Sequence, residues 1–179
     1  MRFESVYSIS ANKIEFQRYP FFFSSLQTNK LLTRDRINAI GLNSFPQSLI
    51  IDNQEIVFVN HDDKQSLASF AHNNTIPLSR HVDTWSMLTR NYLDNQVDEQ
   101  TIEAQNQKLA AIGIDQRAFN RINKMLRYTL TGSTEWVYLG LWDVLAMKQY
   151  RNPFYRFYGK RYYWELMRIA LQGSAYTMR

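Results

Sequence analysis

The chain of 179 residues contains no cysteine and three histidines. Without cysteine it has no disulfide, no thiolate zinc or iron–sulfur site and no cysteine nucleophile. His81 and Asp83 fall on a predicted helix, where they point about 200° apart and do not share a ligand. Asp62 and Asp63 beside His61 are typical of a helix start. We therefore expect no metal site and no cofactor.

The sequence also lacks GxGxxG, GxxxxGK[ST] and HExxH motifs, the usual signatures of dinucleotide, P-loop and zinc-protease sites. Two carboxylates, Glu135 and Asp143, lie in the most apolar segment of the chain. A buried acid pair is one form that a catalytic site takes, so an enzyme with an acidic pocket residue is a third hypothesis. The alternative is structural, with Glu135 at a helix N-terminus and Asp143 paired with an arginine. We expect a protein that is not an enzyme.

Proline and glycine are few, with four and six residues, which excludes fibrous and low-complexity classes. Long apolar runs are also missing. The longest, residues 136–142, is far shorter than the roughly 20 residues that cross a bilayer. The N-terminus alternates instead of forming an apolar run after a basic start, so we expect no secretory signal, a cytoplasmic location and no membrane partner.

The net charge of +5 is unevenly distributed. Residues 1–115 contain 10 basic and 13 acidic residues, a net charge of −3, whereas residues 116–179 contain 11 basic and 3 acidic residues, a net charge of +8. This asymmetry indicates an anionic partner for the second half of the chain. The alternative is that the two oppositely charged halves pack against each other.

The first sixty residues alternate with the period of β-strands. Hairpins are predicted around Ala11-Asn12 and around Asp52-Asn53-Gln54. Residues 34–44 predict a short strand or one helical turn. The segment Tyr19–Phe23 predicts an edge strand or a strand start, because it contains Pro20. Together these segments predict an antiparallel sheet of four to six strands.

From Asp62 onward the apolar residues follow a helical period. The predicted helix at 134–149 is apolar nearly all round, which is typical of a buried central helix. Strands followed by helices indicate the α+β class, with five to six helices after the sheet. We expect subdivisions at 1–60, 61–150 and 151–179 within one compact domain. The expected helices cover approximately 62–74, 79–93, 98–112, 115–131, 134–149 and 160–171.

Residues 108–126, KLAAIGIDQRAFNRINKML, have the layout of a helix-turn-helix with Gly113 in the turn. Phe119 and Ile122 then point inward. The basic residues of the second helix fall on one outward stripe, which suits contact with nucleic-acid phosphates. Lys108-Leu109 departs from the motif, and the alternative is the solvated face of an ordinary helical hairpin. The stripe consists of Arg117, Arg121 and Lys124.

The segment 152–168, NPFYRFYGKRYYWELMR, contains seven aromatic residues. Its second half predicts an amphipathic helix with Trp164, Met167 and Leu171 inward. No helical period explains the rings of NPFYRFYG, which alternate with arginines. Such rings occur at protein interfaces and also stack single-stranded bases. A membrane surface ranks third, because it calls for a longer amphipathic helix.

We therefore expect a non-enzymatic binding or assembly module whose C-terminal half presents a basic, aromatic surface to a protein partner or to a second copy. The second hypothesis makes that partner a nucleic acid. The candidate binding residues are Arg117, Arg121, Lys124, Arg151, Tyr155, Arg156, Phe157, Tyr158, Lys160 and Arg161.

Overall fold

The computed structural model describes residues 4–79, 84–92, 98–130, 139–152 and 154–173. Contacts within the chain divide it into two compact units. The sheet unit consists of residues 1–81 and 154–179, and the helical unit consists of residues 82–153. Strands and helices together confirm the α+β class. The expected subdivision at residues 60 and 150 stays a prediction.

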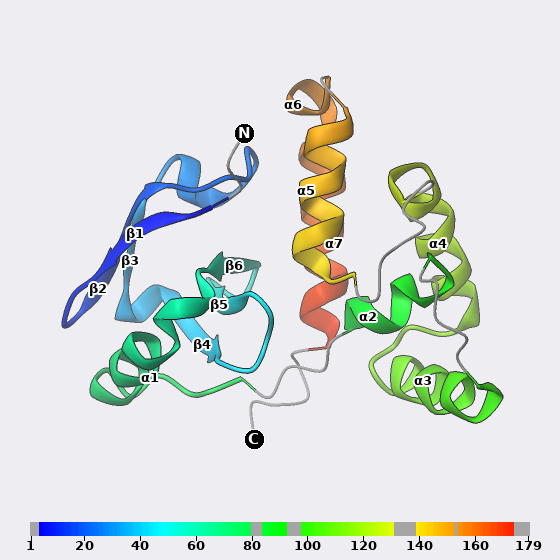
Figure 1. The fold of residues 1–179 in the computed structure, drawn as a ribbon, viewed down its shortest axis with the longest axis horizontal. Helices are drawn as coiled ribbons and strands as arrows, with labels where there is room; N and C mark the ends of the chain where they lie inside the picture. The colour runs from blue at the N-terminus through cyan, green and yellow to red at the C-terminus, as the bar shows by residue number, and fades with distance from the viewer. Residues whose placement is uncertain (1–3, 80–83, 93–97, 131–138, 153, 174–179) are drawn as a thin grey trace. The chain divides into compact units, whose positions relative to one another are not determined.

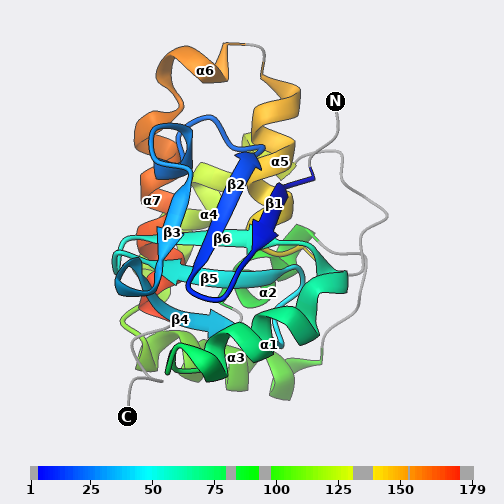
Figure 2. The same cartoon turned by 90° about the vertical axis from the view of Figure 1, so that its left-hand side faces the viewer.

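Within the described residues, the strands of the sheet unit form two antiparallel sheets of three strands each, β1-β2-β3 and β4-β5-β6. The predicted single sheet of four to six strands is wrong, because a 3-10 turn, η2 (Arg34–Arg36), separates β3 from β4. In Figure 2 the strands of the first sheet cross over those of the second. The strands are β1 (Val6–Ile9), β2 (Lys13–Arg18), β3 (Leu31–Thr33), β4 (Ile37–Gly41), β5 (Gln47–Ile51) and β6 (Glu55–Val59).

Both predicted hairpins are confirmed. Ser10 N donates to Lys13 O at 2.9 Å across the turn between β1 and β2. Asp52 and Asn53, between β5 and β6, both have a φ of 52°, in the left-handed region that Asp and Asn tolerate. Residues 34–44 contain both predicted alternatives in succession, the helical turn η2 and then β4. The pattern did not predict β3.

The predicted strand at Tyr19–Phe23 is wrong. The side-chain amide of Gln27 donates to the carbonyl oxygens of Tyr19 and Phe21, both at 2.9 Å, so the chain turns here before η1 (Ser25–Gln27). Side chains of this turn still enter the core, since Tyr19 is 6% and Phe21 1% exposed. An apolar segment with proline thus became a core-filling turn instead of a strand.

Where the structure describes the sheet unit, it contains three α-helices: α1 (Lys64–Asn73), α6 (Tyr155–Tyr158) and α7 (Lys160–Gln172). After η3 (His61–Asp63), α1 buries Leu67, Phe70 and Ala71 as its spacing predicts. The predicted inward side of α7 is partly wrong. Met167 is buried, but Trp164 and Leu171 are only half-buried. The buried side is centred on Tyr163, Leu166, Met167, Ile169 and Ala170.

The helical unit contains α2 (Thr84–Thr89), η4 (Arg90–Tyr92), α3 (Glu99–Ala111), α4 (Gln116–Leu130) and α5 (Leu141–Arg151). Figure 1 shows α3 and α4 joined by a short turn and running in different directions. The predicted starts of α3 and α4 are confirmed, because Asp98 and Asp115 each accept a backbone N–H of the first turn, from Thr101 at 2.8 Å and from Ala118 at 2.7 Å.

The predicted helix 134–149 is only partly described, because residues 134–138 lie outside the described residues. Gly140 is the N-cap of α5, so the described helix begins at Leu141. Val144 and Leu145 are fully buried in it. Across the described residues, no helix combines the length and the apolar character that a membrane crossing needs.

Candidate functional site

The predicted site residues are divided between the two units. The first group lies in α4 of the helical unit and consists of Arg117, Arg121 and Lys124; we name it the α4 row. Arg151 also lies in the helical unit, at the end of α5, and is not part of this row. The second group lies in the sheet unit. All of the predicted residues are exposed except Tyr155. We name the exposed part of the second group, together with Phe154, the α6 surface: Phe154, Arg156, Phe157, Tyr158, Lys160 and Arg161.

Tyr155 anchors α6 to the rest of the sheet unit. It is 2% exposed, and its ring meets the Phe23 ring edge-on at a centroid distance of 5.3 Å. The ring also lies against Gly159, where an added Cβ atom would come within 2.3 Å of two ring carbons. Glycine is therefore required here for space, and its φ of −75° is one that any residue adopts. The buried ring fixes the turn of helix that carries its exposed neighbours.

The segment NPFYRFYG, whose rings no helical period explained, contains the short helix α6. One ring of this helix points inward and its neighbours point outward. Phe154, Phe157 and Tyr158 are 62%, 69% and 63% exposed. Large rings exposed together in one short segment are uncommon on a protein surface that has no partner. Phe154 is one of the NPFYRFYG rings that the sequence singled out but is not among the candidate binding residues, and its exposure adds it to the surface.

Cations accompany these rings. The Arg156 guanidinium lies over the Phe157 ring, 4.8 Å from its centroid, and Lys160 and Arg161 are exposed in the first turn of α7. No acidic residue occurs between Asp143 and Glu165. The ion pairs found among the described residues use none of these cations. The α6 surface therefore combines apolar rings with uncompensated positive charge.

Below the α6 surface, α7 is fixed to β6 by a buried polar contact. The Tyr163 hydroxyl donates to Glu55 Oε1 at 2.5 Å, and the backbone N–H of Ser25 donates to Glu55 Oε2 at 3.0 Å. Glu55 is 1% and Tyr163 1% exposed. Burial, and then the nearby Tyr19 and Glu55, raises the pKa of Tyr163 well above its ordinary value. The hydroxyl therefore stays protonated and keeps donating to the carboxylate. This contact holds α7, which follows the α6 surface in the chain, in a fixed position on β6.

In α4, apolar and basic residues separate onto opposite sides of one helix. Phe119, Ile122 and Leu126 are at most 5% exposed, while all three cations of the α4 row are exposed and form none of the ion pairs among the described residues. The helix follows a turn at Gly113, whose φ is 84°. This arrangement is that of a helix-turn-helix hairpin and equally that of an ordinary amphipathic pair.

The other predicted candidates have structural surroundings or lie outside the described residues. Asp143 is half-buried, and its Oδ2 atom accepts the backbone N–H of Gly140 at 2.8 Å, which caps α5. Glu135 and His81 lie outside the described residues. His72 is exposed in the last turn of α1. Searching the described ranges finds no group of three or more His, Asp or Glu side chains placed to hold a metal ion.

Comparisons with protein-family models, with curated protein sequences and with solved structures find no match. The α6 surface offers rings and cations on a fixed base, a combination suited to binding.

Proposed function

We propose that the protein is a non-enzymatic intracellular binding or assembly module whose α6 surface contacts a protein partner or a second copy of the chain. The observation that carries the proposal is the exposure of Phe154, Phe157 and Tyr158 beside the buried Tyr155. Aromatic residues and arginine are the types enriched at the centres of protein interfaces. Lysine and arginine around them favour an acidic partner surface.

The rigidity of the base supports the same proposal. A ring held on a fixed helix loses little conformational freedom when a partner covers it, so more of the contact energy appears as affinity. Tyr155, packed on Gly159, holds α6 in this way. A partner that buries Phe157 and Tyr158 removes apolar area from water at about 25 cal/mol per Å².

Self-association is tested by light scattering on the full chain over a range of concentrations. We expect a mass above that of the 21.3 kDa chain, and a return to that mass when Phe157→Glu and Tyr158→Glu are combined. The matched control is Phe45→Glu, because Phe45 is similarly exposed, at 66%, in the loop between β4 and β5. A mass unchanged by the double substitution contradicts assembly through the α6 surface.

A different protein partner is tested by placing a photo-crosslinking amino acid at residue 157 and, as control, at residue 45. We expect crosslinked protein products from residue 157 that disappear with Arg156→Glu and Lys160→Glu. Strictly monomeric behaviour together with equal crosslinking from the two positions refutes the proposal.

The α4 row supports nucleic-acid binding as a second candidate. Its cations are exposed on one side of a helix that follows a glycine turn, the layout in which a helix contacts phosphates. Binding of this kind weakens steeply with salt. We expect Arg117→Ala with Arg121→Ala to reduce retention of DNA or RNA at low salt. Arg18→Ala with Lys30→Ala removes the same charge from the sheet unit as a control. No retention by the unmodified chain at low salt excludes this candidate.

A further inference from the structure

The two sheets of the described residues have four outer edges, and other groups of the sheet unit bond to three of them. At the edge of β4, Ile40 N donates to Pro77 O at 3.0 Å and Ser79 N donates to Ile40 O at 2.8 Å. At the edge of β3, the side chains of Asn29 and Arg36 bond to Leu31 N and Leu31 O at 3.2 and 2.9 Å. These contacts satisfy the outward backbone groups of Ile40 and of Leu31, which otherwise recruit another strand.

The outer edge of β6 is covered by side chains. Every second backbone N–H points outward there, and each donates to a side chain of the same unit. Ile56 N donates to Met167 Sδ at 3.4 Å, Phe58 N to Tyr19 Oη at 3.1 Å and Asn60 N to Tyr7 Oη at 2.9 Å. This edge is therefore closed as well.

The edge of β1 is different. Ser10 N donates to Lys13 O, and Ser8 lies opposite Glu15, so residues 8 and 10 direct their backbone groups toward β2. By antiparallel alternation, the N–H and C=O groups of Tyr7 and Ile9 point away from β2. Among the described residues, β1 pairs with β2 alone, and no other described group bonds to these outward backbone atoms.

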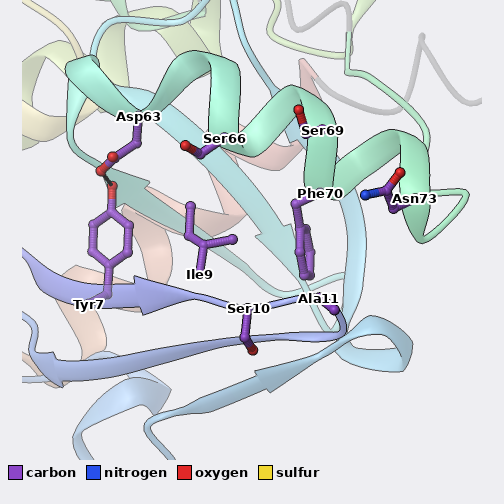
Figure 3. A pocket seen from close by; sticks show the side chains of 9 residues that line it. All are labelled: Tyr7, Ile9, Ser10, Ala11, Asp63, Ser66, Ser69, Phe70 and Asn73. Atoms are coloured by element: carbon purple, nitrogen blue, oxygen red, sulfur yellow. Dashed lines mark hydrogen bonds between the residues drawn. The ribbon is translucent and has the colours of Figure 1, made fainter.

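A groove of about 390 Å³ runs alongside this edge, between β1 and α1 (Figure 3). In Figure 3 the Tyr7 and Ile9 side chains point from β1 toward α1. The opposite wall is one face of the helix, with residues spaced i, i+3, i+4 and i+7. These residues are Ser66, Ser69, Phe70 and Asn73. The α1 side of the groove thus presents hydrogen-bonding side chains, and Ile9 of β1 and Phe70 of α1 provide its apolar part.

One end of the groove is negatively charged. The Tyr7 hydroxyl donates to the Asp63 carboxylate, and Asp62 is exposed next to it. The ion pairs among the described residues use neither acid. A cation brought to this end meets the Asp63 carboxylate, which lines the groove, and lies near the exposed Asp62 that precedes it in the sequence. Charge complementarity therefore selects a basic occupant.

We propose that the β1–α1 groove binds an extended peptide, which adds as a strand to the β1 edge and carries a lysine or arginine beside Asp62 and Asp63. Tyr7 and Ile9 each offer one N–H and one C=O, so the bound segment is short. Its alternate side chains enter the groove over Ile9 and Phe70, because successive residues of a strand point to opposite faces. Peptide recognition by strand addition draws affinity from the main chain and specificity from the groove. This site is independent of the α6 surface.

The test begins with a displayed library of random eight-residue peptides selected on the full chain. We expect the selected peptides to share alternating apolar residues and one basic residue. Synthetic copies are then measured by fluorescence anisotropy. Ile9→Pro removes an outward N–H at an edge position, where proline is tolerated, and we expect about tenfold weaker binding, which corresponds to the loss of about one hydrogen bond.

Two further variants separate charge from backbone. Asp62→Asn with Asp63→Asn is expected to weaken the basic peptides and reduce their salt dependence, whereas the control Glu99→Gln, in α3, is expected to leave binding unchanged. Selected peptides that are N-methylated at alternate amides test strand addition without altering the protein, and one of the two methylation registers is expected to lose binding.

Three outcomes overturn the proposal. The first is a selection that enriches no peptide, and the second is binding that survives Ile9→Pro and both methylation registers. The third is a dimer of the full chain that Ile9→Pro converts to monomer, because β1 then pairs with a second copy.

Discussion

Two arginine–phenylalanine pairs, one in each unit, have the same separation in different surroundings. The Arg90 guanidinium lies 4.8 Å from the centroid of the Phe119 ring in the helical unit, and the Arg156 guanidinium lies 4.8 Å from that of Phe157 in the sheet unit. Arg90 and Phe119 are 9% and 5% exposed, whereas Phe157 is 69% exposed. Burial, and not contact distance, separates a contact that holds the fold from one available to a partner.

The buried pair belongs to a network of neutral partners. Arg90 donates through Nη1 to Gln105 at 3.0 Å and through Nη2 to Asn106 at 2.7 Å, so it links η4 to α3 as well as to Phe119 of α4. Burial lowers the pKa of Arg90. The exposed pair has no such role, because its ring leaves most of its surface in water.

The largest expected difference comes from removing each phenylalanine ring. Phe119→Ala leaves a cavity between α4 and its neighbours and is expected to lower the free energy of unfolding by about 3–5 kcal/mol. Phe157→Ala removes an exposed ring and its contact with Arg156, and is expected to change it by about 1 kcal/mol or less. Urea denaturation of the full chain measures both. A loss of several kcal/mol for Phe157→Ala contradicts the assignment of Phe157 to a binding surface.

Two glycines extend the comparison to the turns before α4 and α7. Gly159→Ala forces a Cβ atom against the Tyr155 ring and is expected to cost about 1–3 kcal/mol. Gly113→Ala meets no atom within 4 Å but must adopt a φ of 84°, with an expected cost of about 1–2 kcal/mol. Denaturation midpoints provide the measurement.

A second substitution distinguishes the two causes. In a Tyr155→Ala background the ring is gone, so Gly159→Ala is expected to cost less, with the remaining cost set by the Tyr155 carbonyl oxygen 2.6 Å from the added Cβ atom, while Gly113→Ala keeps its full cost. Additive costs at Gly159 indicate that the Tyr155 carbonyl oxygen, and not the ring, requires glycine there.

Features that depend on contacts within one turn are predicted by the sequence, whereas features that depend on contacts between distant residues are not. Asp98, Gly113 and Asp115 signal the ends of α3 and α4 locally, since a cap bonds to backbone within its own turn. The inward positions of α4 follow from its period alone. The direction of Tyr155 does not, because Phe23, more than a hundred residues away in sequence, provides its contact. The split into two sheets at η2 also depends on packing between strands.

The β1–α1 groove was missed for a related reason. The spacing of Ser66, Ser69, Phe70 and Asn73 places them on one face of α1. Three of these residues are polar, so the apolar pattern of the helix does not indicate this face. The open edge of β1 becomes visible only when the hydrogen bonds of the other edges are known. An edge strand is a property of the assembled sheet, and the β1 sequence alone does not contain it.

The hydroxyl oxygen of Tyr155 is buried and has no hydrogen-bond partner among the described residues, and burial raises the pKa of Tyr155. Tyr155→Phe keeps the ring and removes an unsatisfied group, so it is expected to stabilise the protein by about 1 kcal/mol at neutral pH. Thermal or urea denaturation at pH 7 checks the sign, and a destabilisation of similar size indicates that the hydroxyl has a partner.

The pH dependence of the same variant provides a second check. Above pH 10 the unfolded chain ionises its tyrosines while the folded Tyr155 stays protonated, so stability falls as pH rises. Tyr155→Phe removes this contribution and is expected to lose less stability between pH 9 and about pH 11 than the unmodified chain. Parallel stability curves indicate that Tyr155 has the same pKa in both states.

The smallest expected effect is the coupling within the exposed pair. A double-mutant cycle with Arg156→Gln and Phe157→Leu is expected to give about 0.5–1 kcal/mol, because water screens an exposed cation over a ring, whereas Arg90→Gln with Phe119→Leu is expected to give about 2 kcal/mol. Denaturation of the six variants and the unmodified chain measures both couplings. Equal couplings show that distance alone sets the strength of these contacts. A smaller coupling at Arg156 means that a partner loses little contact energy within the chain when it separates Arg156 from the Phe157 ring, so both side chains can bind the partner instead.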